Sequence, residues 1–207
     1  MIARILDFFH GTSSGRPTWL EIGCGDAQVS LEIAKRNPGA NVLATDQYRK
    51  GDPRTDAYAK VTHDWEQGEL QAQQSGLDNI SIARAEFNIL HEIPDHSLDY
   101  LLLINTSTPS ALQDLCSYKR LIQQKLKIGG VILWYPYNNP EIYVDVNNHY
   151  HFQKTENFSW LEAIIPNLSS WSRSRTRPQT GFMIWTNTPE ERPVSRFLSE
   201  QETGASA

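Results

Sequence analysis

The chain has 207 residues, of which 39% are hydrophobic, and it carries a formal net charge of -5 at neutral pH. This length suits one globular domain with a substantial core and leaves little room for a second domain. No segment approaches the roughly 20 apolar residues that span a bilayer, and the acidic balance argues against a protein that holds nucleic acid mainly through its phosphates.

The two ends of the chain predict the extent of the domain, and its cysteines indicate its compartment. The apolar stretch 1–9 is short and lacks a small-residue cleavage site, so it predicts a short helix on one sheet face in place of a signal peptide. The polar residues from about 199 predict fraying, so we expect a single domain over 1–198 and a flexible tail over 199–207. Cys24 and Cys116 form neither a disulfide framework nor a metal quartet, which favours a reducing, cytoplasmic location.

Strand and helix signals alternate along the first half of the chain. A helix-patterned segment ends at Asn37-Pro38, and Gly76 is a C-cap signal for a later helix. A polar loop covers 47–55, between the second strand and that later helix. The predicted elements are a strand at 18–22, a helix at 27–36, a strand at 41–45, a helix at 56–75 and a strand at 80–83.

The second half of the chain completes the pattern. Residues 98–104 are almost continuously apolar, as in a strand buried on both faces of a parallel sheet. A helix is predicted at 111–126, a break at Gly129-Gly130, a strand at 131–135, a helix at 159–165, and two strands at 171–176 and 181–186. These elements predict an α/β fold, doubly wound, with a mostly parallel seven-stranded sheet, an antiparallel C-terminal edge hairpin and helices on both faces.

The segment Glu21-Ile-Gly-Cys-Gly-Asp-Ala27 joins the first strand to the first helix. Glycines let the backbone approach a ligand closely, and the helix start offers N–H groups that lack partners within the helix. A dinucleotide fingerprint needs a third small residue where Gln28 stands, which argues against NAD or FAD. A phosphate-binding Walker A loop is excluded because no Gly-Lys-Ser/Thr follows, and an ordinary turn that uses glycine for geometry alone stays open.

This segment resembles the E-x-G-x-G-x-G pattern of class I S-adenosylmethionine-dependent methyltransferases, with Ala27 in place of the last glycine. Asp46 ends the second strand, where that family has an acidic residue on the ribose hydroxyls, and Glu86 stands where an acidic residue lies near the adenine amino group. The turn at 126–130 is similar to the family's L-K-P-G-G turn. The resemblance implies a Rossmann-like methyltransferase fold, S-adenosyl-L-methionine as cofactor, and cofactor contacts from Glu21, Gly23, Cys24, Gly25, Asp46, Gln47, Glu86, Phe87 and Asn105.

A closer resemblance is to the tRNA (guanine-N7) methyltransferases, through residues 20–46, 93–98 and 125–131. That family follows the fourth strand with a D-P-W-P-K-type segment and basic residues, whereas this chain has Asn105-Thr-Ser-Thr-Pro-Ser110. The departure favours shared ancestry over a shared substrate, and the acidic net charge agrees. Arginines at 173, 175 and 177 form a local basic group, for which a solvated hairpin is the alternative interpretation.

Candidate catalytic residues follow the fourth and fifth strands. Asn105, Thr106 and Tyr137 are neutral hydrogen-bonding groups that suit the orientation of an amine or a heterocyclic nitrogen. His149 is the candidate base. His149 and His151 lack a third ligand at a recognisable spacing, so we predict no metal. Alternatively, Tyr150 and Phe152 pack into the core and the side chains of both histidines are exposed to solvent.

These observations predict an S-adenosylmethionine-dependent methyltransferase that N-methylates a small nitrogen-containing metabolite. The alternatives are a diverged tRNA (guanine-N7) methyltransferase and a cofactor-binding pseudoenzyme that serves as a partner subunit. We expect a small-molecule substrate in preference to RNA and no membrane partner, and we leave a homodimer and other reactions of the cofactor open.

Overall fold

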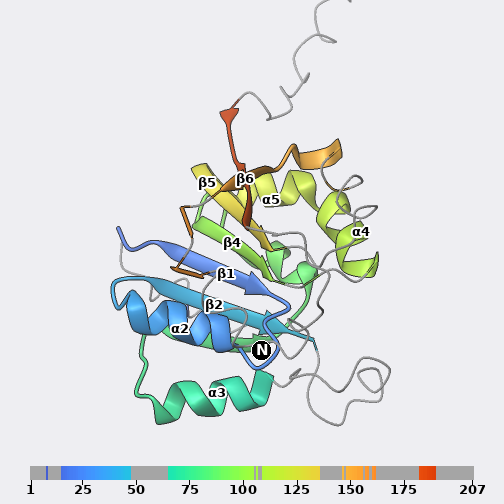
Figure 1. Cartoon of the computed structure of the whole chain (residues 1–207). Helices are drawn as coiled ribbons and strands as arrows, with labels where there is room; N and C mark the ends of the chain where they lie inside the picture. The colour runs from blue at the N-terminus through green and yellow to red at the C-terminus, as the bar shows by residue number, and fades with distance from the viewer. Residues whose placement is uncertain are drawn as a thin grey trace, which may run out of the picture.

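The computed structural model describes residues 8, 15–47, 65–104, 106, 109–135, 146, 148–155, 157–158, 160–161 and 182–189 of the chain. Strands and helices alternate through these residues (Figure 1). In chain order the elements are β1 (Thr18–Ile22), α2 (Gln28–Arg36), β2 (Asn41–Asp46), α3 (Trp65–Gln74), β3 (Ile80–Arg84), the 3-10 helix η1 (Phe87–His91), β4 (Leu98–Ile104), α4 (Pro109–Ser117), α5 (Lys119–Lys125), β5 (Leu126–Tyr135), β6 (Gln153–Thr155) and β7 (Phe182–Thr186).

The strands form one seven-stranded sheet in the order β3-β2-β1-β4-β5-β7-β6. The pairs from β3 to β5 are parallel, and β7 runs antiparallel to both β5 and β6. The predicted α/β fold class, doubly wound with an antiparallel C-terminal strand, is confirmed.

The strand on the outer side of β7 differs from the prediction. We expected a hairpin with 171–176, which lies outside the described residues, whereas Gln153–Thr155 pairs with β7 in the structure. Two of the three β6 residues are exposed and none is apolar. A short edge strand of this kind has no hydrophobic alternation, so the sequence pattern could not reveal it.

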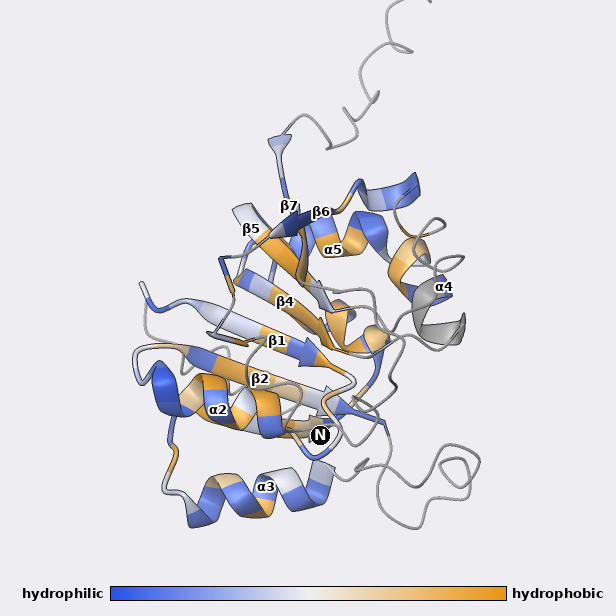
Figure 2. Ribbon diagram, in the orientation of Figure 1, coloured by the Kyte–Doolittle hydropathy of each residue, from blue (hydrophilic) through white to orange (hydrophobic). Residues whose placement is uncertain are grey.

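Helices cover both faces of the sheet, as predicted. Figure 1 shows α2 and α3 on one side and α4 and α5 on the other. The side chains of β4 alternate between these layers: Leu101 and Leu103 belong to the cluster that includes α4 and α5 residues, and Leu102 and Ile104 to the cluster that includes α2 residues. Figure 2 shows β4 and β5 as largely hydrophobic strands, in keeping with burial on both faces.

Two predicted boundaries on the β5 side were wrong. The single helix expected at 111–126 is two helices, because Tyr118 leaves helical geometry (φ -86°, ψ 5°) between α4 and α5. Hydrogen bonds continue on both sides of Tyr118, so the helical periodicity does not reveal the change. Gly129-Gly130 lies inside β5 instead of before it, where the β4–β5 register shifts and Gly129 has a φ of +80°.

The described part of α3 ends as expected at Gly76, which has a φ of +64°. Gly76 N–H donates to Gln73 O at 3.1 Å and Leu77 N–H donates to Ala72 O at 3.2 Å. This pair of bonds is the Schellman arrangement, and a left-handed residue at this position favours glycine. The predicted helical residues 56–64 lie outside the described part of the chain.

Candidate functional site

The candidate site lies at the carboxyl edge of the sheet, between β1 and β4. These strands are neighbours, yet the chain leaves β1 for α2 on one face and leaves β4 for α4 on the other. Such a switch point opens a crevice beyond the strand ends, where ligands of open α/β sheets bind. The predicted glycine segment and Thr106 meet at this point.

The turn at residues 23–27, called the glycine turn below, has an unusual backbone. Gly23, Gly25 and Ala27 have φ values of +79°, +58° and +59°. The N–H groups of Gly23 and Cys24 both donate to Thr45 O, at 2.8 and 2.9 Å, which ties the turn to the end of β2. Ala27 thus keeps the left-handed conformation at the position where the methyltransferase pattern has its last glycine. This conformation has a steric cost for alanine that glycine would avoid.

Asp46 ends β2 directly beside the glycine turn. Its side chain is buried, and its Oδ2 accepts a hydrogen bond from the Gly25 N–H at 2.9 Å. A carboxylate has two oxygens and about four acceptor positions, which suits a ligand that presents hydroxyl donors. The bond also fixes the carboxylate relative to the turn. The buried acceptor and the left-handed glycines fit the adenosine part of the predicted cofactor.

Glu21 is buried in β1 under helix α2. Its Oε2 accepts a hydrogen bond from Ser30 Oγ at 2.5 Å. Burial raises the pKa of Glu21 from 4.5 to about 8, the hydrogen bonds from Ser30 act in the opposite direction, and the carboxylates of Asp46 and Asp26 raise it further. Glu21 is therefore mostly protonated at neutral pH. Its predicted cofactor contact stays a prediction.

Helix α3 packs directly against the glycine turn. A Cβ atom on Gly68 would lie 2.7 Å from Asp26 O and 2.9 Å from the Ala27 Cβ, so only glycine allows this approach. Beside it, Gln28 Nε2 donates to Gln71 Oε1 at 2.5 Å. Gln28, the residue that argued against a dinucleotide, thus helps to attach α3 to the start of α2.

The other predicted cofactor residues lie around the same edge. Gln47 O accepts a hydrogen bond from Arg84 Nε at 3.1 Å. Glu86 is exposed at the start of η1, and its N–H donates to Asn88 Oδ1 at 3.3 Å. Phe87 is buried in the core with its ring 6.1 Å from that of Tyr118. Burial raises the pKa of the Cys24 thiol well above its usual range, and the neighbouring Glu21 adds to the rise, so this thiol is unsuited to nucleophilic chemistry.

Thr106 is held against the glycine turn. Its Oγ1 lies within hydrogen-bonding distance of two carbonyl oxygens, Ile22 O at 3.0 Å and Ile104 O at 3.2 Å. A Cβ atom on Gly23 would lie 2.8 Å from the same Oγ1. Thr106 therefore braces the turn across the switch point. Two other predicted catalytic residues, Asn105 and Tyr137, lie outside the described residues.

His149 is exposed, and it lies beside helix α5, on the face of the sheet opposite helix α2. Its carbonyl oxygen accepts a hydrogen bond from Lys119 Nζ. Tyr150 and Phe152 are buried while His151 is exposed, as the alternative interpretation of this segment expects. The role of His149 as a base stays a prediction.

Sequence reasoning missed Ser30, Gly68 and Gln71 as parts of the site. Gly68 carried a usable signal, since a glycine inside a helix weakens it and often marks a close approach. Ser30 and Gln71 carried none, because their partners, Glu21 and Gln28, lie on other elements and meet them only after packing. Within the described residues, no cluster of His, Cys, Asp and Glu could hold a metal ion, and no helix is long and apolar enough to traverse a bilayer.

Neither a protein-family model nor a curated protein matches the sequence. Solved structures match the fold. The 16S rRNA methyltransferase KamB aligns with a TM-score of 0.57 and 17% identity over 90% of this chain and 94% of that one. The aminoglycoside resistance methyltransferase NpmB1 aligns with a TM-score of 0.54 and 14% identity over 90% and 93% of the two chains.

A third match is a mutant of the 16S rRNA (adenine(1408)-N(1))-methyltransferase from Catenulisporales acidiphilia with the cosubstrate SAM. It aligns with a TM-score of 0.53 and 13% identity over 94% of each chain. The chain therefore has the fold of S-adenosylmethionine-dependent methyltransferases. The narrower relation to tRNA (guanine-N7) methyltransferases stays a prediction.

Proposed function

We propose that the chain is an S-adenosylmethionine-dependent methyltransferase that methylates a nitrogen atom of a small metabolite. The observation that carries the proposal is the position of Asp46, a buried carboxylate that touches the glycine turn at the switch point of a methyltransferase-type sheet. A carboxylate accepts hydrogen bonds through both of its oxygens, so ligand hydroxyls at this edge would meet an acceptor that is fixed beside the glycine turn.

Different residues of the chain would bind the cofactor and align the methyl acceptor. Asp46 would accept hydrogen bonds from the ribose hydroxyls, and the glycine turn would let the backbone approach the cofactor closely. The cofactor supplies an electrophilic methyl group on a sulfonium. Methyl transfer is an in-line displacement, so the protein contributes chiefly by aligning the nucleophile and removing its proton where needed. For that alignment we propose the neutral residues Asn105, Thr106 and Tyr137, with His149 as the base.

A small metabolite is preferred over RNA because the net charge is -5, whereas phosphate binding usually needs a basic surface. RNA is the second candidate, since two of the similar structures are named as 16S rRNA methyltransferases. A diverged tRNA (guanine-N7) methyltransferase falls within this second candidate. A partner subunit that binds the cofactor without using it is the third.

Calorimetry with S-adenosylmethionine and its demethylated product, S-adenosylhomocysteine, tests the cofactor. We expect the natural chain to bind both ligands. Asp46→Asn keeps the size of the side chain but loses its charge, so it should weaken binding by about 10- to 100-fold, the value of a hydrogen bond to a charged group. Asp78→Asn is the matched control, because Asp78 is exposed at the opposite end of β3. Failure of the natural chain to bind either ligand would reject the function.

Transfer of a radioactive methyl group then separates the substrate classes. The natural chain is incubated with labelled S-adenosylmethionine and, separately, with a metabolite extract and with total RNA. Label in a small amine supports the leading proposal. Label in RNA, with RNA binding that weakens steeply as salt is raised, supports the second candidate. Tight cofactor binding without transfer to either pool supports the partner subunit.

A further inference from the structure

Glu21 is a buried acid whose negative charge is not balanced by any cation in the described part of the chain. Its side chain is 3% exposed, and the hydrogen bonds it accepts come from Ser30, a neutral residue. An ionised carboxylate in such surroundings is costly unless a cation or several donors compensate it. Glu21 therefore favours its neutral form before a ligand binds.

The groups that face Glu21 from the surrounding elements are acidic or uncharged. Asp46 on β2 and Asp26 in the glycine turn act on it electrostatically, and the Cys24 thiol is close enough to respond to its charge. The residues paired with it in the neighbouring strands are Ala44 and Leu102. Burial and these carboxylates together raise the pKa of Glu21 to about 8. A positive charge at the turn would stabilise the ionised carboxylate and so lower the pKa of Glu21.

We propose, on the basis of the proposed function, that Glu21 releases its proton when a cationic cofactor binds at the glycine turn. The O–H bond of the carboxylic acid breaks, the electron pair stays on the carboxylate, and the proton passes to the buffer. The ionised Glu21 then attracts the sulfonium through a medium of low polarity. Methyl transfer removes the sulfonium charge, so Glu21 takes a proton back and binding weakens. Glu21 thus makes the site prefer the charged cofactor over its neutral thioether product.

Calorimetry in two buffers with different heats of ionisation, phosphate and Tris, counts the released protons. At pH 7 we expect the natural chain to release close to one proton per bound S-adenosylmethionine and clearly less per bound S-adenosylhomocysteine. Both ligands carry the same amino-acid group, so their difference isolates the sulfonium charge. Glu21→Gln should abolish the difference in proton release and lower the preference for S-adenosylmethionine over S-adenosylhomocysteine by about tenfold.

The control is Glu32→Gln, the same change on the surface of α2, where Glu32 pairs with Arg36. It should release as many protons as the natural chain. Binding of S-adenosylmethionine by the natural chain without proton release would overturn the role of Glu21 and leave the proposed function standing. Failure to bind either ligand would overturn the proposed function, and the role of Glu21 with it.

Unfolding of the ligand-free protein provides a second readout that does not depend on binding. A buried acid with a raised pKa keeps its proton in the folded chain while the unfolded chain loses it near pH 4.5. The unfolded state then binds fewer protons, so stability falls as pH rises from about 4.5 to about 8 and levels off above. In Glu21→Gln this part of the decline should be missing. An unchanged pH profile in Glu21→Gln would show that Glu21 is already ionised before binding and would overturn the proposal.

Discussion

The carboxyl edge of β1 and β2 and the β5–β7 side of the sheet are stabilised in different ways. At the first edge the glycine turn lies against Thr45 O, Asp46 and Thr106, and the Thr106 side chain leaves no room for an added Cβ at Gly23. In the proposed function, the backbone of this turn is what approaches the cofactor. This edge, residues 23–27 with Asp46, is called the cofactor edge below.

On the β5–β7 side one buried amide organises the backbone. Asn187 N–H donates to Gly130 O, and Asn187 O accepts a hydrogen bond from the Gly129 N–H. Its Nδ2 lies within 3.0, 3.0 and 3.1 Å of the carbonyl oxygens of Gln123, Leu126 and Lys127. This group, called the Asn187 clamp, lies around the first residues of β5, far along the strand from its carboxyl end. We therefore expect substitutions at the cofactor edge to change the proposed ligand binding and substitutions in the clamp to change stability.

The largest effect is expected from Gly23→Ala at the cofactor edge. Alanine at a φ of +79° costs about 1–2 kcal/mol, and its methyl group would meet Thr106 Oγ1 at 2.8 Å, which adds an overpacking cost of about 1–3 kcal/mol. Displacement of the turn should weaken S-adenosylmethionine binding at least about 100-fold, equal to about 3 kcal/mol. Calorimetry and thermal unfolding measure both effects.

The control for this change is Gly39→Ala, because Gly39 has no atom within 4 Å of an added Cβ and no left-handed φ. It should leave both stability and binding within error of the natural chain. Natural cofactor affinity in a folded Gly23→Ala variant would contradict the assignment of the cofactor edge.

Asn187→Ala should have the next largest effect, on stability alone. The loss of one buried donor that serves three carbonyl groups should lower the free energy of unfolding by about 2–4 kcal/mol. Asn157→Ala is the control, since Asn157 is exposed on the same side of the sheet. Denaturant unfolding gives the free energy of unfolding, and calorimetry gives the cofactor affinity. A parallel loss of affinity at temperatures where the variant is folded would show that the two regions are coupled.

The cofactor edge could be predicted from the sequence because its determinants are local. Left-handed backbone positions favour glycine, so a Gly-x-Gly turn between an apolar run and a helix pattern can be recognised in the sequence. Asp46 could be placed because it ends the next strand, and parallel strands end at the same edge. Even Ala27 was recognisable as a small residue at the third position, although its left-handed φ was not.

Other contacts, at the cofactor edge and elsewhere, depend on how separate helices and strands pack against one another. Glu21 and Ser30, or Gly68 and Asp26, meet only once the helices pack, and nothing in their immediate neighbours indicates the partner. The strand β6 is too short and too polar to produce an alternating pattern. Gly129-Gly130 was predicted to end the helix at 111–126 before a strand at 131–135, whereas in the structure the contacts with Asn187 keep both glycines within β5.

Gly68→Ala tests whether α3 belongs to the cofactor edge. Within an exposed helix, glycine to alanine normally stabilises a protein by up to about 1 kcal/mol. Here the new methyl group would lie 2.7 Å from Asp26 O, so we expect a net loss of about 1–3 kcal/mol and weaker cofactor binding. Gln74→Ala, at an exposed position of the same helix, is the control. A stabilised variant with natural affinity would show that α3 is independent of the glycine turn.

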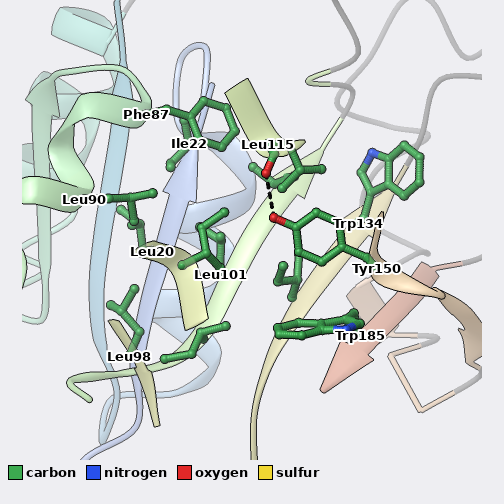
Figure 3. Close-up of a cluster of buried hydrophobic side chains, with 14 of the residues drawn as sticks. Leu20, Ile22, Phe87, Leu90, Leu98, Leu101, Leu115, Trp134, Tyr150 and Trp185 are labelled. Atoms are coloured by element: carbon green, nitrogen blue, oxygen red, sulfur yellow. Dashed lines mark hydrogen bonds between the residues drawn. The ribbon is translucent and has the colours of Figure 1, made fainter. Parts of the chain in front are cut away.

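The smallest effect is expected from Tyr150→Phe. The Tyr150 hydroxyl donates to Leu115 O at 2.6 Å in the buried cluster above Trp185 (Figure 3). Its loss leaves a buried carbonyl without this donor and should cost about 1–2 kcal/mol of stability. Tyr118→Phe is the control, because within the described residues the Tyr118 ring makes aromatic contacts with Phe87 and His91 and its hydroxyl has no hydrogen-bond partner.

The same variant separates packing from catalysis in the segment that contains His149. If Tyr150 only anchors this segment, Tyr150→Phe should lower stability while methyl transfer, measured well below the unfolding temperature, stays within about twofold of the natural rate. His149→Ala in the same assay should then lower the rate about 100-fold or more if His149 is the base. A natural rate in His149→Ala would remove His149 from catalysis, and the base would have to come from another residue near the ends of β4 and β5.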